Sequence, residues 1–452
     1  MQVDDFLGHL ENGGDRPAIV SDAGTVSYDQ LYKKVGEYCR ELAAQSISGS
    51  GVLLVDNYSV NSICMLLALW VHNNVVALSV PKSEKDIAHL ASSAGARATI
   101  IGGAPQGFTI IRNEARMVPP ALDELLSSRR AGFIVFSSGS TGPAKGVVHQ
   151  IAPFFDRYLK ADNCGAILAF LLFDHIGGLV TVLHALATHG TLVIPNERSP
   201  QEVGRCIEVF NVETLHVSPT LLNLAIVAGV FQKWDTRSVR RIYFGSEPSS
   251  AECIRRIRNT LPHVELCQLY GMSEIGVLPC SNKDGDSAWM KVEDQNYSIK
   301  VVGGILHVRG ATNMVGYISG TAPLSSDGYL ITEDLAEEKE GFFRVTGRAV
   351  DVINVGGKKV IPSDVEHVLM KLENVSDVVV YAHPNHLLGQ VVAARFTLFE
   401  PEKLDDFRVR LYRSIRGIFS PEELPRVISI SERPLHTSRF KKMRNPGIPI
   451  IS

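Results

Sequence analysis

Serines, a threonine and a lysine follow an apolar segment in the first third of the chain, and their spacing suits an anion. Residues 132–149 read GFIVFSSGSTGPAKGVVH, so a buried strand is expected to enter a Gly/Ser/Thr-rich loop that ends at Lys145. Glycines permit positive φ, so several backbone N–H groups can converge on one anion, while the hydroxyls and Lys145 add donors and charge. The segment predicts a phosphate site; a Ser/Gly surface turn after a strand is the alternative.

The spacing of this loop differs from that of P-loop nucleoside triphosphatases, because Gly139 and Gly142 stand too close together and Gly146 follows Lys145. The loop instead resembles the signature loop of the adenylate-forming superfamily, which includes acyl-CoA synthetases, peptide-synthetase adenylation domains and luciferases. Five further segments resemble motifs of this family and occur in the same order. They are GSEP (245–248), YGMSE (270–274), YLITED (329–334), GR (347–348) and TSRFKKMR (437–444).

The resemblance implies ATP and Mg²⁺ as cofactors and assigns roles within the motifs. Glu274 is the expected Mg²⁺ ligand, with a solvated loop carboxylate as the alternative; the metal and Lys145 would balance phosphate charge. Asp334 and Arg348 would hold the ribose hydroxyls, or would form only an ordinary ion pair. The expected ATP-binding residues are Ser137, Ser138, Gly139, Ser140, Thr141, Gly142, Lys145, Gly245, Ser246, Glu247, Pro248, Tyr270, Gly271, Met272, Ser273, Asp334 and Arg348.

The resemblance places the catalytic lysine of adenylation at Lys441, with Lys442 as its rival. A basic tail of this kind can also be only a solvated face. The chain departs from the family pattern at three places: Glu333 and Phe440 replace glycines, and Val350 stands at the hinge position. Each departure is expected to bear on rotation of the C-terminal domain.

The segment FDHIGG (173–178) closes an apolar strand, and the resemblance puts His175 beside the acyl group and the α-phosphate. A capping or core histidine is the alternative. Asp174 would pair with a substrate amine or cap a helix. The pocket suggests an apolar or aromatic acid of modest size. Its expected lining is Phe173, Asp174, His175, Val217, Ser218, Phe244, Leu269, Met272 and Ile275.

Strand-like and helical segments alternate over the first two thirds of the chain, which predicts an α/β fold. Residues 1–348 are expected to form a large N-terminal domain of stacked mixed or parallel sheets with helices, including a small β subdomain at about 297–348. Residues 349–452 are expected to form a small, mobile α+β domain that carries the catalytic lysine. Ser83 is predicted to cap one helix, and a capping box over 363–366 to open another.

The family's second half-reaction requires an acceptor for the acyl group. Gly356 and Gly357 resemble the residues that leave room for a pantetheine arm; a tight glycine turn is the alternative. We expect an enzyme that activates a carboxylic acid as acyl-AMP and transfers it to CoA. The alternatives are transfer to a carrier-protein phosphopantetheine or a nitrogen nucleophile, a non-catalytic nucleotide-binding relative, and an unrelated nucleoside triphosphatase.

The composition and net charge of the chain limit the classes of partner that we expect it to bind. The 452 residues are 45% hydrophobic with a formal charge of −3, which allows several cored domains and argues against nucleic acid as a partner. The acidic N-terminus and the polar residues after Val71 predict neither secretion nor a membrane span. Seven cysteines without a C-x-x-C pair predict reduced thiols and a cytoplasmic location. A homodimer is one expected assembly, because dimers are common among relatives.

Overall fold

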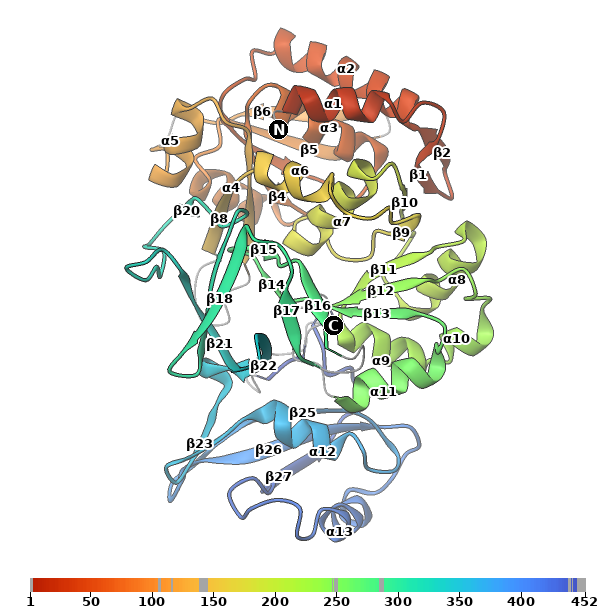
Figure 1. The fold of residues 1–452 in the computed structure, drawn as a ribbon, viewed down its shortest axis with the longest axis vertical. Helices are drawn as coiled ribbons and strands as arrows, with labels where there is room; N and C mark the ends of the chain where they lie inside the picture. The colour runs from red at the N-terminus through yellow and green to blue at the C-terminus, as the bar shows by residue number, and fades with distance from the viewer. Residues whose placement is uncertain are drawn as a thin grey trace.

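The structure is a computed structural model that describes residues 3–104, 107–114, 117–137, 145–245, 247, 251–283, 288–437, 440 and 442–444. Two large sheets and their helices form the upper and right parts of the view in Figure 1. A smaller antiparallel sheet lies beside them, and a separate sheet with two helices forms the bottom. This arrangement is the predicted α/β fold with a small α+β C-terminal domain.

The first two sheets have seven strands each. One is parallel except for the pair β1–β2 (Pro17–Ser21 and Gly24–Ser27), and the other is mixed, with a parallel centre and antiparallel pairs toward both edges. One has the order β13 (Glu265–Gln268), β12 (Arg241–Phe244), β11 (Thr214–Val217), β9 (Ala166–Leu168), β10 (Thr191–Val193), β1 (Pro17–Ser21), β2 (Gly24–Ser27). The other has the order β20 (Gly316–Tyr317), β8 (Lys145–Gln150), β7 (Gly132–Ser137), β4 (Val75–Ser79), β3 (Gly51–Val55), β5 (Ala98–Ala104), β6 (Gly107–Arg112).

Helices cover these sheets and join them. Because α3 and α7 are apolar on all sides, they must be buried, and every residue of α7 is. One core cluster contains both helices and strand residues of both sheets. Ser83 caps α4 as predicted, accepting from the Asp86 N–H. The helices are α1 (Val3–Glu11), α2 (Tyr28–Ala44), α3 (Val60–Val71), α4 (Glu84–Ser93), α5 (Pro120–Ser127), α6 (Ala152–Tyr158), α7 (Ile176–Ala187), α8 (Pro200–Phe210), α9 (Pro219–Val227), α10 (Val230–Lys233) and α11 (Ala251–Thr260).

The third sheet is antiparallel and corresponds to the predicted β subdomain, although it also recruits strands before residue 297. Its first strand lies against β13, where the Gln268 N–H donates to Asn282 Oδ1 at 2.8 Å. The order is β16 (Cys280–Asn282), β17 (Met290–Val292), β22 (Phe342–Arg348), β21 (Leu330–Lys339), β19 (Ile305–Gly310), β18 (Tyr297–Val302). A separate two-stranded pair consists of β14 (Gly271–Met272) and β15 (Gly276–Val277).

The C-terminal sheet has its own hydrophobic core. A short 3-10 helix, η1 (Ala349–Asp351), leads into it from β22. Its elements are β23 (Ile353–Val355), β24 (Lys358–Val360), α12 (Pro362–Leu369), β25 (Val375–Asn385), β26 (Gly389–Leu398), α13 (Leu404–Ser414) and β27 (Val427–Ile430). The sheet order is β24-β23-β26-β25, with β27 pairing β26.

The predicted capping box at the start of α12 is wrong. The helix has Ile361 at its N-cap and Pro362 in its first turn, and no side chain caps it. The Ser363 hydroxyl instead donates to the Thr346 carbonyl at 2.5 Å. Glu366 accepts from the Val380 N–H at 2.9 Å, so tertiary partners take both side chains that the local pattern would have used for capping.

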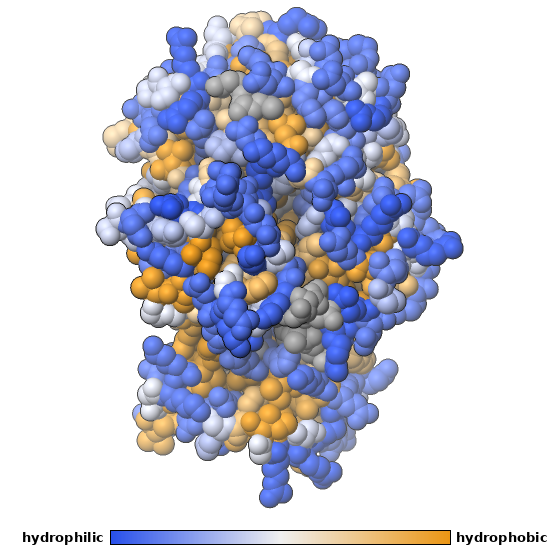
Figure 2. Space-filling model, viewed as in Figure 1, coloured by the Kyte–Doolittle hydropathy of each residue, from blue (hydrophilic) through white to orange (hydrophobic). Residues whose placement is uncertain are grey.

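Figure 2 shows a mostly hydrophilic surface on this face, with hydrophobic residues gathered between the middle and the bottom of the view. Among the described residues, no helix is long and apolar enough to cross a membrane. The six cysteines whose side chains the structure describes are free thiols, as expected.

Candidate active site

The predicted phosphate loop connects two antiparallel strands. β7 ends at Ser137, whose backbone pairs with Lys145 at the start of β8. Lys145 Nζ lies 5.7 Å from the centre of the Tyr317 ring, close enough for a cation–π contact. The other predicted loop residues lie outside the described residues; they are Ser138, Gly139, Ser140, Thr141 and Gly142.

Glu274 lies next to this strand pair. The Tyr317 hydroxyl donates to Glu274 Oε1 at 2.9 Å, so Tyr317 contacts both Lys145 and the predicted metal ligand. Proteins often hold Mg²⁺ with one or two carboxylates together with substrate phosphates. In the described part of the chain no three His, Cys, Asp or Glu side chains group to hold a metal. A single carboxylate beside the strands that flank the predicted phosphate loop therefore fits Mg²⁺ that arrives with ATP.

Tyr270, Asp334 and Arg348 form one polar group. The Tyr270 hydroxyl donates to Asp334 Oδ2 at 2.6 Å, and Arg348 Nε lies 3.3 Å from Asp334 Oδ1. Asp334 and Arg348 are also partners across β21 and β22. Burial and the neighbouring carboxylate raise the pKa of Tyr270 well above its usual value, so the phenol keeps its proton. The structure thus brings together the two predicted ribose-binding residues, as an ion pair.

The GSEP motif follows β12. A Cβ atom on Gly245 would lie 2.4 Å from the Leu269 carbonyl oxygen, so this close approach of two strand ends requires glycine. Glu247 accepts from the Thr220 N–H at 3.2 Å and from its hydroxyl at 2.5 Å. Burial raises the pKa of Glu247. Ser246 and Pro248 lie outside the described residues.

A cavity of about 290 Å³ lies between α6, α7, β11 and β12. Four predicted acyl-pocket residues line it: His175, Val217, Phe244 and Leu269. Gly245 and Gly271, from two nucleotide motifs, also line it. The cavity therefore reaches the residues predicted to bind ATP.

His175 lines the cavity and also caps α7. Its Nδ1 accepts the Gly177 N–H at 3.1 Å, so the neutral imidazole carries its proton on Nε2. The capping alternative and the position beside the acyl cavity are thus both observed for this residue.

Five predicted lining residues are not part of the cavity wall. Phe173 is buried against Tyr58, and the Asp174 carboxylate accepts from the Val80 N–H at 3.3 Å. The Ser218 hydroxyl caps α9 and donates to the Phe440 carbonyl. Met272 and Ile275 belong to the hydrophobic core of the β subdomain.

Sequence reasoning missed several polar lining residues, among them Arg157, His184, His216 and Tyr243. A polar residue inside a short apolar strand was the available signal for His216 in TLHV and for Tyr243 in RIYF. His216 and Tyr243 are register partners on the parallel strands β11 and β12, which no local pattern reveals.

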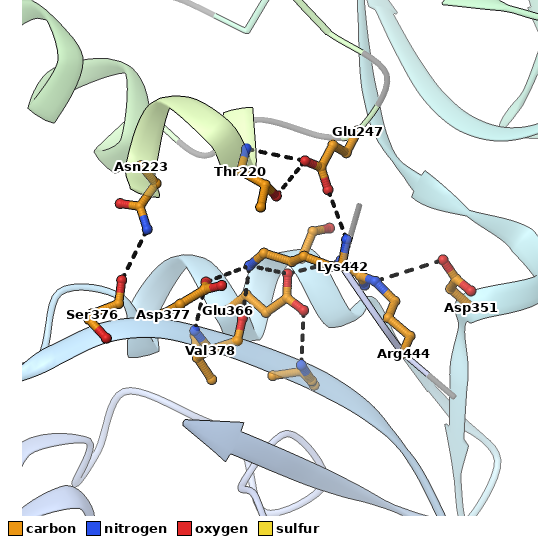
Figure 3. A network of polar contacts seen from close by, with 12 residues as sticks. Thr220, Asn223, Glu247, Asp351, Glu366, Ser376, Asp377, Val378, Lys442 and Arg444 are labelled. Carbon is orange, nitrogen blue, oxygen red and sulfur yellow. Dashed lines mark hydrogen bonds and ion pairs between the residues drawn. The ribbon is translucent and has the colours of Figure 1, made fainter. Parts of the chain in front are cut away.

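Lys442 joins the C-terminal tail to the C-terminal sheet (Figure 3). Its Nζ donates to the Val378 carbonyl at 2.8 Å and pairs with Glu366 at 3.4 Å and with Asp377 at 3.5 Å. The neighbouring carboxylates raise the pKa of Lys442 despite its burial. Arg444 also pairs with Glu366, at 2.9 Å. Lys442 therefore has structural partners, while Lys441 lies outside the described residues.

The same tail contacts the N-terminal body. The Lys442 N–H donates to Glu247 at 3.4 Å, and Asn223 of α9 donates to the Ser376 carbonyl at 3.0 Å (Figure 3). One contact thus connects the C-terminal part of the chain to the GSEP motif, and the other connects it to α9.

Phe440 occupies a conformation that favours glycine. Its φ is +54°, and the residue is 8% exposed. The ring lies 5.2 Å from the Phe170 ring, and the Arg198 guanidinium lies 5.3 Å from it. Phe440 thus has a left-handed backbone, which a glycine would adopt without strain, and adds a buried aromatic contact to the N-terminal body.

The other departures and the predicted thiol tunnel lie near the domain boundary. Val350 is 64% exposed on η1, and Asp351 pairs weakly with Arg444 at 3.9 Å. Gly356 and Gly357 have φ of +57° and +94° and form the turn between β23 and β24. Positive φ at both positions is typical of a two-residue hairpin turn, which is the alternative expected for this pair.

An α/β body with nucleotide motifs at its strand ends, joined to a small α+β domain, is the architecture of an adenylate-forming enzyme. A family model described as AMP-binding enzyme matches residues 8–318. The chain belongs to this family of AMP-binding enzymes.

Known proteins are similar to this chain in sequence and in fold. The 4-coumarate--CoA ligase-like 6 of Arabidopsis thaliana is 26% identical over 369 residues, which cover 71% of this chain and 64% of that protein. The match thus spans less than two thirds of that relative. The o-succinylbenzoate CoA synthetase of Bacillus subtilis, solved with its acyl-adenylate intermediate, is 19% identical, with a TM-score of 0.79 over 98% of this chain and 97% of that one. The amide bond synthetase of Marinactinospora thermotolerans is 20% identical, with a TM-score of 0.77 over 97% of each chain.

Proposed function

We propose that this enzyme activates a carboxylic acid as its acyl-adenylate, releases pyrophosphate and transfers the acyl group to CoA. One observation carries the proposal: the cavity that holds His175 is also lined by Gly245 and Gly271, which belong to two nucleotide motifs. An acid in the cavity would thus have its carboxylate next to the α-phosphate of ATP. Proximity of this kind supplies a large part of the rate in bimolecular reactions.

In the proposed reaction, a carboxylate oxygen attacks the α-phosphorus, and the bond to the β-phosphate oxygen breaks as pyrophosphate leaves. Lys145 and the phosphate loop would hold the β- and γ-phosphates. Glu274 would hold Mg²⁺, which supplies positive charge to the phosphates when bound. Asp334 and Arg348 would orient the ribose, and His175 would donate from Nε2 toward the reacting oxygens.

Lys441 is the proposed catalytic lysine. Its neighbour Lys442 supports this assignment, because the Lys442 ammonium pairs with Glu366 and Asp377 of the C-terminal domain. The tail that holds Lys442 contacts Glu247 beside the nucleotide motifs. A lysine one residue earlier on that tail would thus be carried to the reaction by the C-terminal domain, and we propose that residues 349–452 move as this unit.

For the second step we propose CoA, because the named relative is a CoA ligase-like protein and one solved neighbour is a CoA synthetase. Gly356 and Gly357, whose turn lacks side chains, would leave room for the pantetheine arm. Transfer to a nitrogen nucleophile is the second candidate, favoured by the fold shared with an amide bond synthetase. We also propose that the enzyme is located in the cytoplasm and that it forms a homodimer.

The proposal is tested by incubating the enzyme with ATP, Mg²⁺ and a panel of aryl, short-chain, medium-chain and amino acids. Acyl-AMP detected by mass spectrometry without an acceptor, and AMP released on addition of CoA, are the expected results. Release of AMP only with a carrier protein or an amine would show that this compound, and not CoA, is the acceptor. Binding of ATP with no acyl-AMP from any acid would favour a non-catalytic relative.

A further inference from the structure

We propose that the acyl cavity selects acids that carry a hydroxyl group remote from the carboxylate, and that His216 recognises this hydroxyl. The inference rests on the proposed function, because it takes the cavity as the acid site. It names a specificity-determining residue and a substrate class, the hydroxyaryl acids.

The position of His216 is remote from the reacting end of the cavity. His175 stands at the start of α7, whereas His216 contacts Thr181, six residues further along the helix. At about 1.5 Å of rise per residue, the two levels are about 9 Å apart along the helix axis. Ile176, Val180 and His184 of the same helix line the cavity, so the cavity follows α7 between these levels.

The hydrogen bonds of His216 determine which of its nitrogens is free to accept. The Thr181 oxygen lies 2.8 Å from the Gly177 carbonyl oxygen and 3.0 Å from His216 Nδ1. A contact of 2.8 Å between two oxygens is attractive only when a proton lies between them, so the Thr181 hydroxyl donates to Gly177. His216 Nδ1–H must then donate to Thr181, which leaves Nε2 with a lone pair.

His184 presents a second acceptor. Its Nε2 lies 3.0 Å from the Asp162 carbonyl oxygen, which can only accept, so the proton of the neutral ring is on Nε2. Nδ1 then carries the lone pair. The two imidazole rings are 5.5 Å apart. Burial lowers the pKa values of both His184 and His216, so both rings are neutral at physiological pH.

These two acceptors require a donor from the ligand, and the surrounding charge selects among donors. Arg157 lines the same cavity, with its guanidinium 5.5 Å from the Tyr158 ring. A substrate ammonium would be repelled by Arg157. A carboxylate would be attracted by the cationic lining residues Arg157, Lys160 and Arg198, but it has no proton to donate and would leave both imidazole lone pairs unpaired. A hydroxyl donates to His216 and accepts from cationic or phenolic donors. The aromatic wall of Tyr158 and Phe244 favours an aryl group as its carrier.

The test measures kcat/KM for acid-dependent pyrophosphate release with benzoic and cinnamic acids that carry hydroxyl, methoxy, carboxyl or no substituent. Wild-type enzyme is expected to prefer the hydroxy acids at least tenfold, because a buried acceptor left unpaired penalises the unsubstituted acid. His216→Phe keeps the Thr181 hydroxyl bonded to Gly177 and removes the acceptor. The preference is expected to fall about threefold or more, since only the His184 acceptor is then left unpaired by an unsubstituted acid.

Val180→Ala is the matched control, since it changes the volume of the cavity but no hydrogen bond, and it is expected to keep the hydroxyl preference. His184→Phe, which removes the second acceptor, is the further variant should His216→Phe fail to fold. An unchanged hydroxyl preference in that variant would overturn recognition of the hydroxyl by the two imidazoles. If the wild type uses unsubstituted acids as well as hydroxy acids, or better, this inference is wrong while the proposed function stands. An unchanged preference in His216→Phe also overturns the assignment to His216. A wild type that converts no acid at all overturns the proposed function and this inference together.

Discussion

The imidazole of His149 and the carbonyl of Ser273 lie 2.6 Å apart, although 124 residues separate them in the chain. A carbonyl only accepts, so His149 Nε2–H is the donor. His149 lies on β8, which leads away from the phosphate loop, and Ser273 precedes the predicted metal ligand Glu274. One partly buried hydrogen bond thus fixes the spacing of two segments that are predicted to bind ATP.

This contact predicts acid sensitivity. Burial lowers the pKa of His149 to about 4, below its ordinary value of 6.5. As the pH falls from 6.5 to 4, the unfolded chain takes up a proton that the folded chain refuses, so folded-state stability falls. The expected loss at pH 5 is about 2 kcal/mol from this one group. The free energy of unfolding is measured with denaturant for the wild type and for His149→Gln at pH 7.5 and at pH 5. An equal change between the two pH values in both proteins would contradict the prediction.

Lys442 is predicted to stabilise the C-terminal domain. Lys442→Met removes the ammonium from Glu366 and Asp377 and leaves their charge poorly compensated. The expected loss is about 3 kcal/mol in the stability of this domain, since removing one partner of a buried pair is costly. Amide hydrogen exchange in β25 measures it. Protection equal to that of the wild type would show that the pairs contribute little.

Lys441→Ala is predicted to act on chemistry instead. Acid-dependent ATP–pyrophosphate exchange should fall about 100-fold or more, as for loss of one transition-state donor, with β25 protection unchanged. Lys442→Met serves as the comparison at the neighbouring position. Exchange lost in Lys442→Met and retained in Lys441→Ala would reverse the assignment.

Phe440 is predicted to hold the C-terminal tail against the N-terminal body. Phe440→Gly relieves the cost of a positive φ, about 1–2 kcal/mol, but removes a buried ring that contributes about 3 kcal/mol. The balance predicts about tenfold slower pyrophosphate exchange. Phe440→Leu, which keeps apolar contact with Phe170, should be intermediate. Exchange in Phe440→Gly as fast as in the wild type would show that the ring does not hold the tail for adenylation.

Tyr270→Phe is predicted to weaken ATP binding. It removes the 2.6 Å hydrogen bond to Asp334, and a bond to a charged group contributes about 1.5–3 kcal/mol. The dissociation constant for ATP, measured by calorimetry, should rise about tenfold. Tyr297→Phe is the control, because it removes a hydrogen bond to Thr312 in the same subdomain. Equal losses in both variants would mean a general effect on the β subdomain.

Local patterns predicted local structure well. The cap at Ser83 and the apolar strands around Lys145 were readable because neighbouring residues determine them. The capping box at 363–366 failed because Thr346 and Val380, distant in sequence, bond the same side chains. Local sequence carries no information on that competition.

The residues that line the cavity could be predicted from the sequence only in part. His175, Val217, Phe244 and Leu269 lie at the ends of strands or shortly after them, and these ends meet, so their convergence could be expected. His216 faces Tyr243 only because β11 and β12 pair in one register, and that register depends on the whole sheet. Phe440 looked like a lost glycine, and only the structure shows that its ring has buried partners.

The most direct test of the account follows oxygen from the acid to the nucleotide. The enzyme is supplied with a reactive acid labelled with ¹⁸O in its carboxylate, together with ATP, Mg²⁺ and CoA, and the products are analysed by mass spectrometry. Attack of the carboxylate on the α-phosphorus predicts one ¹⁸O atom in AMP and none in pyrophosphate. Label in inorganic phosphate with formation of ADP, or AMP without label, would contradict an acyl-adenylate intermediate.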